Sequence, residues 1–242
     1  MVRSWALGAL GRYGEALAAL DDIGTIGRGE EAVVHGRVPN TRASMLFDLG
    51  LVEMALDADE ESLEITRGAS GAGVAEPQIQ TLLNLATDHL QLDDPDRAAG
   101  CLREVEALAV EAEYARFRFL NRYHWVQGLL HLHAGELDTA LADAAQVAAM
   151  AEQYGAPKYL VRAGLLRGLV LARQAREHDR ALAELRDAAA RAEQHGFAAL
   201  AERAHREAAD LLGGGGLHAR EADQWRARIV RSVEGPLRTL LH

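Results

Sequence analysis

AEQYG at 151–155 and AEQHG at 192–196 are nearly identical pentapeptides that lie 41 residues apart. The triplet Ala-Leu-Ala, at 140–142 and again at 181–183, is displaced by the same interval. Two different marks with one displacement indicate that the chain repeats itself. A period of about 20–50 residues is typical of stacked supersecondary units, none of which buries its apolar face alone. Such arrays are more often binding surfaces than catalysts.

The composition favours an all-α chain. Hydrophobic residues make up 49% of the 242 residues and aromatic residues only 5%, so the apolar content is mostly Ala and Leu, which are strong helix formers. No segment alternates apolar and polar residues for long enough to predict a strand. The formal net charge of −10 argues against nucleic acid as a partner, because that binding requires neutralisation of phosphates.

Cysteine usage and hydropathy predict a cytoplasmic protein. Cys101 is the single cysteine, so there is no internal disulfide. The N-terminal stretch has one early arginine and a short apolar run broken by glycine, which does not resemble a secretion signal. No run approaches the roughly 20 apolar residues that span a bilayer, so no membrane segment is expected.

Prolines, glycines and acidic residues mark the expected helix ends. Asp94-Pro95 is typical of an N-cap followed by a first-turn proline, and Gly155 and Gly196 suit left-handed C-caps. Pro39 is expected just before a helix, and the acidic run 57–61 is interpreted as a solvated helix start. The predicted helices are 2–10, 13–25, 41–56, 59–68, 77–91, 95–112, 115–134, 136–154, 158–175, 177–195, 197–212 and 218–232. Glycine-rich loops are expected at 26–40 and 69–76, and a break at 213–216.

Small residues recur at the expected helix contacts. Gly128 is followed by Gly135, Leu137 and then Ala140-Leu141. This pattern resembles the tetratricopeptide repeat (TPR), which has a small residue midway in helix A, glycine at the turn and alanine in helix B. Residues 84–86 with Ala98, and the segment 11–17, are similar to the same motif. Looser matches are Gly50 with Ser62, Gly168 with Ala181 and Ala209 with Ala222.

The spacing of the repeats departs from the standard motif. The small residues of helix B fall at 16, 62, 98, 140, 181 and 222, whereas the usual period is about 34 residues. The longer period is similar to that of the helical-repeat regions of large bacterial signal-transduction ATPases and LuxR-type regulators. The phosphate-binding sequence G-x-x-x-x-G-K-[ST] is absent, so no P-loop is expected.

The resemblance implies an all-α fold, an α-solenoid of TPR-like antiparallel helix pairs in a single domain over 1–242. Residues 1–25 would form a partial leading unit, which allows an oligomer through this end. The expected helix pairs are 41–68, 77–112, 115–154, 158–195 and 197–232.

The resemblance also implies a concave groove lined by the second, fifth, ninth and twelfth residues of each helix A. The candidate binding residues placed there are Phe47, Gln80, Asn84, Thr87, Arg122, Trp125, Arg162 and Arg203. Asn84 falls where peptide-binding members place an asparagine that holds a ligand backbone. Phe47 and Trp125 have a second interpretation, as core side chains packed between neighbouring helices.

Three of these candidates share one position of successive A helices. Arg122, Arg162 and Arg203 would form a positive stripe that favours an acidic peptide or a carboxylate ligand. The alternative is that they bridge to acids of neighbouring helices, and Arg203 has Glu207 on its own helix.

Histidines form the only cluster that suggests a metal. His131 and His133 lie two residues apart on a helix and therefore point to different faces, whereas His124 shares a face with His131. We expect structural histidines, and neither a metal nor a cofactor.

The expected function is therefore a non-enzymatic module that binds a protein or peptide in bacterial signalling or transcriptional regulation. The alternative is a small-molecule effector-sensing domain of a larger regulator. An enzyme is the least supported class, because no convergent set of titratable groups is evident.

Overall fold

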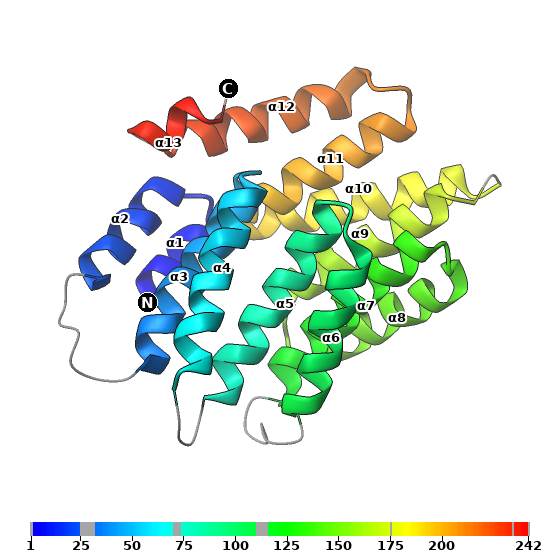
Figure 1. Cartoon of the computed structure of the whole chain (residues 1–242). Coiled ribbons are helices and arrows are strands. Elements are labelled where there is room, and N and C mark those ends of the chain that lie inside the picture. Colours follow the sequence, from blue (N-terminus) through cyan, green and yellow to red (C-terminus); the bar gives the residue numbers. More distant parts are fainter. Residues whose placement is uncertain are drawn as a thin grey trace. The chain divides into compact units, whose positions relative to one another are not determined.

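The computed structural model describes residues 2–24, 32–69, 74–109, 116–174, 176–233 and 235–241. These residues form α-helices joined by short turns and include no strand (Figure 1). Helices that follow one another along the chain pack as antiparallel pairs, so the all-α, repeat-like prediction is confirmed. No described helix is both long enough and apolar enough to cross a membrane.

The helices belong to two compact units. Unit 1 comprises Met1–Gly8, Arg12–Tyr123 and Ser232–His242, and unit 2 comprises Ala9–Gly11 and His124–Arg231. Unit 1 is built from α1 (Val2–Ala9), α2 (Tyr13–Gly24), α3 (Ala32–Asp48), α4 (Val52–Arg67), α5 (Ala75–Gln91), α6 (Pro95–Ala109) and α13 (Pro236–Thr239). Unit 2 is built from α8 (Leu137–Gln153), α9 (Pro157–Ala172), α10 (His178–His195), α11 (Ala198–Leu211) and α12 (Gly216–Arg231). Helix α7 (Arg116–Ala134) contributes its first residues, up to Tyr123, to unit 1 and the rest to unit 2.

Each helix hairpin contains a pair of buried small residues, one on each helix, 12 or 13 positions apart in the sequence. The pairs are Ser4–Ala16, Ala43–Ala55, Ala86–Ala98, Gly128–Ala140, Gly168–Ala181 and Ala209–Ala222. Their second members recur at intervals of 39 to 43 residues, which is more regular than the spacing expected from the sequence. The repeat is therefore a repeat of helix contacts.

Direct contacts show how closely the helices approach. Ser4 Oγ donates a hydrogen bond to the backbone oxygen of Ala16 at 2.9 Å. A Cβ atom added at Gly128 would lie 3.7 Å from the backbone oxygen of Ala140, and one added at Gly168 would lie 3.4 Å from that of Ala181. Only a small residue fits at such positions.

The hairpin of α3 and α4 corrects the sequence prediction. Helix α3 begins at Ala32 and contains Pro39, where a loop was expected over 26–40 (residues 26–31 lie outside the described part). Helix α4 begins at Val52, where the prediction ended one helix at 56 and began the next at 59. Proline removes one backbone donor and is unfavourable inside a helix. Packing of α3 against α4 outweighs this local preference.

The partner of Gly50 was also wrong in the sequence prediction. Gly50 has a φ of 82° and makes the turn between α3 and α4. The small residue of α4 at the contact with α3 is therefore Ala55, where the prediction had Ser62. Ser62 instead donates a hydrogen bond to the backbone oxygen of Gly36 at 2.8 Å. The other predicted helices agree with the structure to within three residues where both are described.

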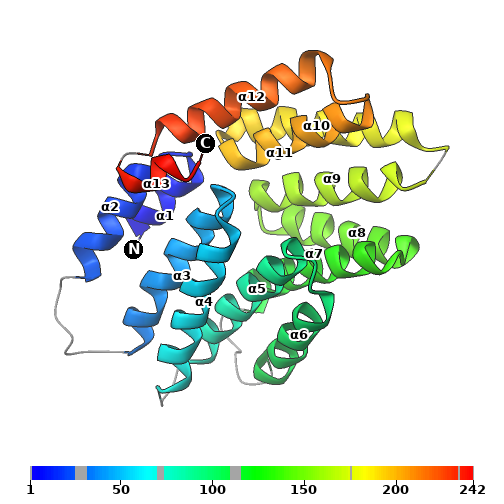
Figure 2. The same cartoon turned by 45° about the horizontal axis from the view of Figure 1, so that its top comes forward.

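The C-terminal segment of unit 1 packs against its first helices (Figures 1 and 2). The backbone nitrogen of Tyr13 donates to Ser232 Oγ at 3.3 Å, although the two residues are 219 positions apart. Leu237 of α13 packs on the apolar cluster that contains Ala43 and Ala55. In a linear array each repeat contacts only the repeats next to it in the sequence, so this contact is not part of the repeat pattern.

We expect Gly128→Ala to lower the free energy of unfolding. The new Cβ would lie 2.5 Å from Leu166 Cδ2 and 3.0 Å from Asp143 Cβ, so packed groups must shift. Overpacking of this kind costs about 1–3 kcal/mol, which exceeds the gain of about 1 kcal/mol in helix propensity. Urea denaturation followed by circular dichroism measures the change.

Gly100→Ala on α6 is the matched control. Its Cβ would meet only the end of the Arg103 side chain, at 3.8 Å, so the helix propensity of alanine should stabilise the chain. Equal stability of the two variants would contradict the close-approach interpretation.

Candidate functional site

Helix α5 is buried on all its faces in its middle turns. Thr81–His89 is an unbroken run of nine buried residues, whereas a helix with one solvent face alternates buried and exposed positions. Asn84 and Thr87, both predicted to line a groove, are 3% and 5% exposed, and Gln80 is half-buried. Several buried residues of this run are polar, so they need partners inside the protein.

Asn84 is the centre of a hydrogen-bond network that joins α3, α4, α5 and α7. Its Nδ2 donates to Asp59 Oδ1 at 3.0 Å, and its Oδ1 accepts from the Arg122 guanidinium. Asn40 on α3 donates to the same Asp59 oxygen, also at 3.0 Å. The side-chain amide of Asn84 is therefore engaged at both ends within unit 1.

Two carboxyl groups lie beside this network. Asp59 and Asp88 are each 1% exposed. Burial raises the pKa of Asp59 well above its ordinary value, and the charge of Asp88 raises it further, although hydrogen bonds from Asn84 and Asn40 oppose the change. Burial also raises the pKa of Asp88 to about 7, against the effect of Arg122 and of its hydrogen bond with Asp59. Both shifts favour the protonated carboxyl group, because two adjacent buried carboxylates do not ionise together readily.

Sequence reasoning missed this pair because it placed the start of α4 too late. Asp59 was interpreted as part of a solvated helix start, but α4 begins at Val52 and Asp59 lies inside it. A signal was present on each helix. Buried polar residues follow the spacing of one helix face, at 59, 62 and 66 on α4 and at 81, 84 and 88 on α5.

Some polar atoms of this region have no partner among the described residues. Asp88 Oδ2, Arg122 Nε and both amide atoms of Asn121 are buried without a hydrogen bond. Leaving such a group unpaired costs about 1–3 kcal/mol. The α5–α7 contact of unit 1 is therefore less well satisfied than the surrounding core.

In unit 2, Trp125 and Arg162 form a stacked pair. The Arg162 Cζ atom lies 4.2 Å from the Trp125 ring centroid and 5.2 Å from that of Tyr159. Trp125 is 5% exposed, and Arg162 is half-buried. In unit 1, Phe47 is half-buried against the apolar cluster of α3 and α4. Each of the two aromatic candidates therefore packs against other residues of its own unit, as the core interpretation expects.

The three arginines of the predicted stripe have separate surroundings. Arg122 bonds to Asn84, Arg162 stacks on two rings, and Arg203 Nε lies 3.8 Å from Glu207 Oε1 on its own helix. Burial raises the pKa of Glu207, an effect that the charge of Arg203 opposes.

Asp143 on α8 contacts two of the histidines of α7, His124 and His131. His131 Nδ1 lies 2.7 Å from Asp143 Oδ2, and His124 Nδ1 lies 3.6 Å from Oδ1 of the same carboxylate on α8. His133 is exposed. Among the described residues no group of three or more His, Cys, Asp or Glu side chains could hold a metal ion. The two half-buried histidines, His124 and His131, therefore join α7 to α8.

A second histidine network in unit 2 was not predicted. His205 is buried, and its Nε2 lies 2.9 Å from Glu193 Oε1 while its Nδ1 lies 2.9 Å from His218 Nδ1. Trp225 donates to the same glutamate oxygen at 3.1 Å. Burial lowers the pKa of His218, and the neighbouring His205 lowers it further. The network joins α10, α11 and α12 across the glycine break.

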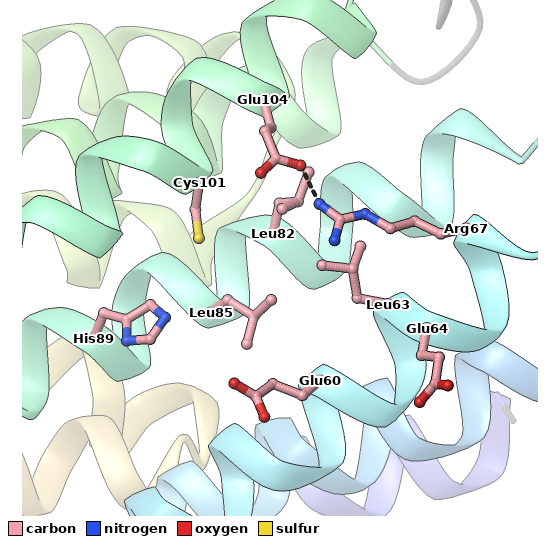
Figure 3. Close-up of a pocket in the computed structure, with 9 residues that line it drawn as sticks. All are labelled: Glu60, Leu63, Glu64, Arg67, Leu82, Leu85, His89, Cys101 and Glu104. Atoms are coloured by element: carbon pink, nitrogen blue, oxygen red, sulfur yellow. Dashed lines mark hydrogen bonds and ion pairs between the residues drawn. The ribbon is translucent and has the colours of Figure 1, made fainter.

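A cleft of about 440 Å³ lies between α4, α5 and α6 of unit 1 (Figure 3). Leucines form its apolar part, and charged or polar side chains surround them. The lining residues are Glu60, Leu63, Glu64, Arg67, Leu82, Leu85, His89, Cys101 and Glu104. The predicted groove residues are not among them.

Comparison with known proteins does not identify a family for this chain. No family model matches this sequence, and a search of curated proteins gives no significant match.

We expect the buried acid pair to make the free energy of unfolding fall as the pH rises. Folding moves the pKa of Asp88 from 3.8 to about 7, so within that window the native chain holds a proton that the unfolded chain has released. Each such proton lowers the free energy of unfolding by about 1.4 kcal/mol per pH unit. Asp88→Asn should remove this contribution, and at pH 8 it should be more stable than the wild type.

Urea denaturation at several pH values between 4 and 8 measures the slope. Asp57→Asn, on the exposed side of α4, is the control and should keep the wild-type slope. A wild-type slope in Asp88→Asn would show that this carboxyl group does not take up the proton.

A chelator should leave the melting temperature unchanged. His131 and His124 are held by Asp143, so removal of metal ions breaks none of their contacts. A structural zinc would behave oppositely, because its binding energy is part of folding. Thermal melts before and after dialysis against a strong chelator test this, and a drop of several degrees that zinc reverses would overturn the structural assignment.

Proposed function

We propose that this chain is a non-enzymatic, TPR-like interaction module that binds a protein or peptide in bacterial signalling or transcriptional regulation. In this proposal unit 2 holds an acidic group of the partner at Arg162. The observation that carries it is the stacking of the half-buried Arg162 guanidinium on Trp125 and Tyr159.

Stacking prepares an arginine for binding. The aromatic rings pack on a face of the planar guanidinium and its Nε is buried, so in this proposal a carboxylate binds the two terminal nitrogens in a bidentate pair. A side chain that is already restricted loses less conformational entropy when the ligand binds. A half-buried, stacked arginine therefore supports recognition of an Asp, a Glu or a C-terminal carboxylate.

The other candidates support this role less well. Arg122 donates to Asn84 beside the Asp59–Asp88 pair, so its charge is balanced within unit 1. Arg203 faces Glu207. Substitution of Arg122 would remove a partly buried hydrogen bond and lower stability, whereas substitution of Arg162 tests binding.

A small-molecule sensor is the second candidate. The cleft of unit 1 has a volume of about 440 Å³, within the usual range of roughly 300–1,000 Å³ for small-ligand pockets. Catalysis has less support. The strongly perturbed acid pair is enclosed in the core, and a general acid or base must reach its substrate.

Selection from a random peptide library displayed on phage tests the proposal. We expect the wild-type chain to enrich peptides rich in Asp and Glu. Arg162→Ala should weaken their binding about tenfold or more, since a hydrogen bond to a charged group contributes about 1.5–3 kcal/mol. Titration of the enriched peptides by fluorescence anisotropy measures this loss.

Arg203→Ala is the matched control, because this arginine has the equivalent predicted position and faces Glu207 on its own helix. It should bind the same peptides as the wild type. Peptides without an acidic bias, or equal binding by Arg162→Ala, would contradict the proposal.

A further inference from the structure

The cleft between α4, α5 and α6 combines an apolar floor with an acidic edge. In Figure 3, Glu60 and His89 point toward the same space around Leu85, whereas the carboxylate of Glu64 points away from it. The three leucines of the lining offer contact to an aliphatic chain.

The charges of the lining are unbalanced. Glu104 pairs with Arg67, the single arginine of the lining. Glu60 and Glu64 form no ion pair with any described residue. The cleft therefore has an excess of negative charge, and Glu60 lies on the side that faces the leucines.

His89 supplies an acceptor inside the cleft. The residue is 7% exposed, and no described residue makes a hydrogen bond with its ring. Burial lowers the pKa of His89, so near neutral pH the imidazole is uncharged and one ring nitrogen accepts a hydrogen bond. The charges of Asp94 and, to a smaller extent, Glu60 act in the opposite direction but do not outweigh burial.

An organic cation fits this lining better than a metal ion. Burial raises the pKa of the Cys101 thiol to about 11, so the sulfur is protonated at neutral pH, whereas metal binding requires the thiolate. The described residues also contain no group of three or more His, Cys, Asp or Glu side chains arranged for a metal.

We propose that this cleft binds an alkylammonium group: Glu60 provides the opposite charge, His89 accepts a hydrogen bond from the ammonium, and Leu63, Leu82 and Leu85 contact the aliphatic chain. The ligand is either a free aliphatic amine or the lysine side chain of a partner protein. This site lies in unit 1 and selects a cation, so it stands independently of the acidic-peptide site proposed at Arg162 of unit 2.

The proposed chemistry discriminates among ligands of similar size. A carboxylate is repelled by the uncompensated glutamates. A trimethylammonium group keeps the charge but has no N–H to donate to His89. A neutral alcohol keeps the chain but loses the attraction to Glu60.

Isothermal titration calorimetry with hexylammonium as the probe tests the proposal. Hexylammonium should bind about tenfold or more tightly than hexyltrimethylammonium, hexanol or hexanoate. Equal affinities for the four compounds, or no binding of hexylammonium, would overturn the proposal.

Two variants on one helix assign the site. Glu60→Gln should reduce hexylammonium affinity about tenfold or more, because it removes the charge that faces the leucines. Glu64→Gln removes an equal charge one turn away, but the Glu64 carboxylate points away from the leucines, so the affinity should stay within about twofold of the wild type. Equal losses in the two variants would refute the assignment to Glu60.

A final arm separates the two sources of the ligand. The probe is a capped Leu-Lys-Leu tripeptide, compared with the same peptide carrying norleucine in place of lysine. Tighter binding of the lysine peptide than of hexylammonium, with the same loss in Glu60→Gln, would identify a partner's lysine. Binding of hexylammonium without binding of the peptide would identify a free amine.

Discussion

The close approach of two helices at each pair of small residues is the constraint on which the rest of this structure depends. With alanine, serine or glycine at the contact, the backbones come near enough for long leucine side chains to pack above and below it. Gly128 shows how little space is left at such a contact, because one added carbon would collide with Leu166. The constraint repeats every 39 to 43 residues and therefore sets the period of the chain.

One consequence concerns the polar groups of α5. Helices that pack this closely on all faces leave the middle of α5 without a solvent side, so its polar residues must find partners among themselves. Asn84 does so by linking Asp59 to Arg122, and the raised pKa values of Asp59 and Asp88 limit the charge that is buried. Such a network adds little net stability but restricts which helix faces can meet.

The sequence was informative about features that local chemistry determines. Gly155 and Gly196 were predicted as left-handed caps, and their φ values of 61° and 72° confirm this, because a positive φ favours glycine at any helix end. The α3–α4 hairpin was misread because Pro39 and the acidic run at 57–61 are local boundary signals that tertiary packing overrides. The carboxyl pair and the cleft could not be derived, since both depend on which faces of α4, α5 and α6 meet. His205 and His218 illustrate the same limit: they meet only because α12 folds back on α11 after the glycine break.

The net charge of −10 does not decide what this chain binds. At physiological salt, exposed charges are screened over about 8 Å, so a ligand responds mainly to the groups nearest to it. Around Arg162 those groups are two aromatic rings, and around Leu85 they include an unpaired glutamate and a neutral imidazole. Two sites of opposite preference can therefore exist in one acidic chain. Each depends on a helix contact: Arg162 on α9 lies over Trp125 of α7, and Glu60 and His89 are brought to one cleft by the packing of α4 on α5.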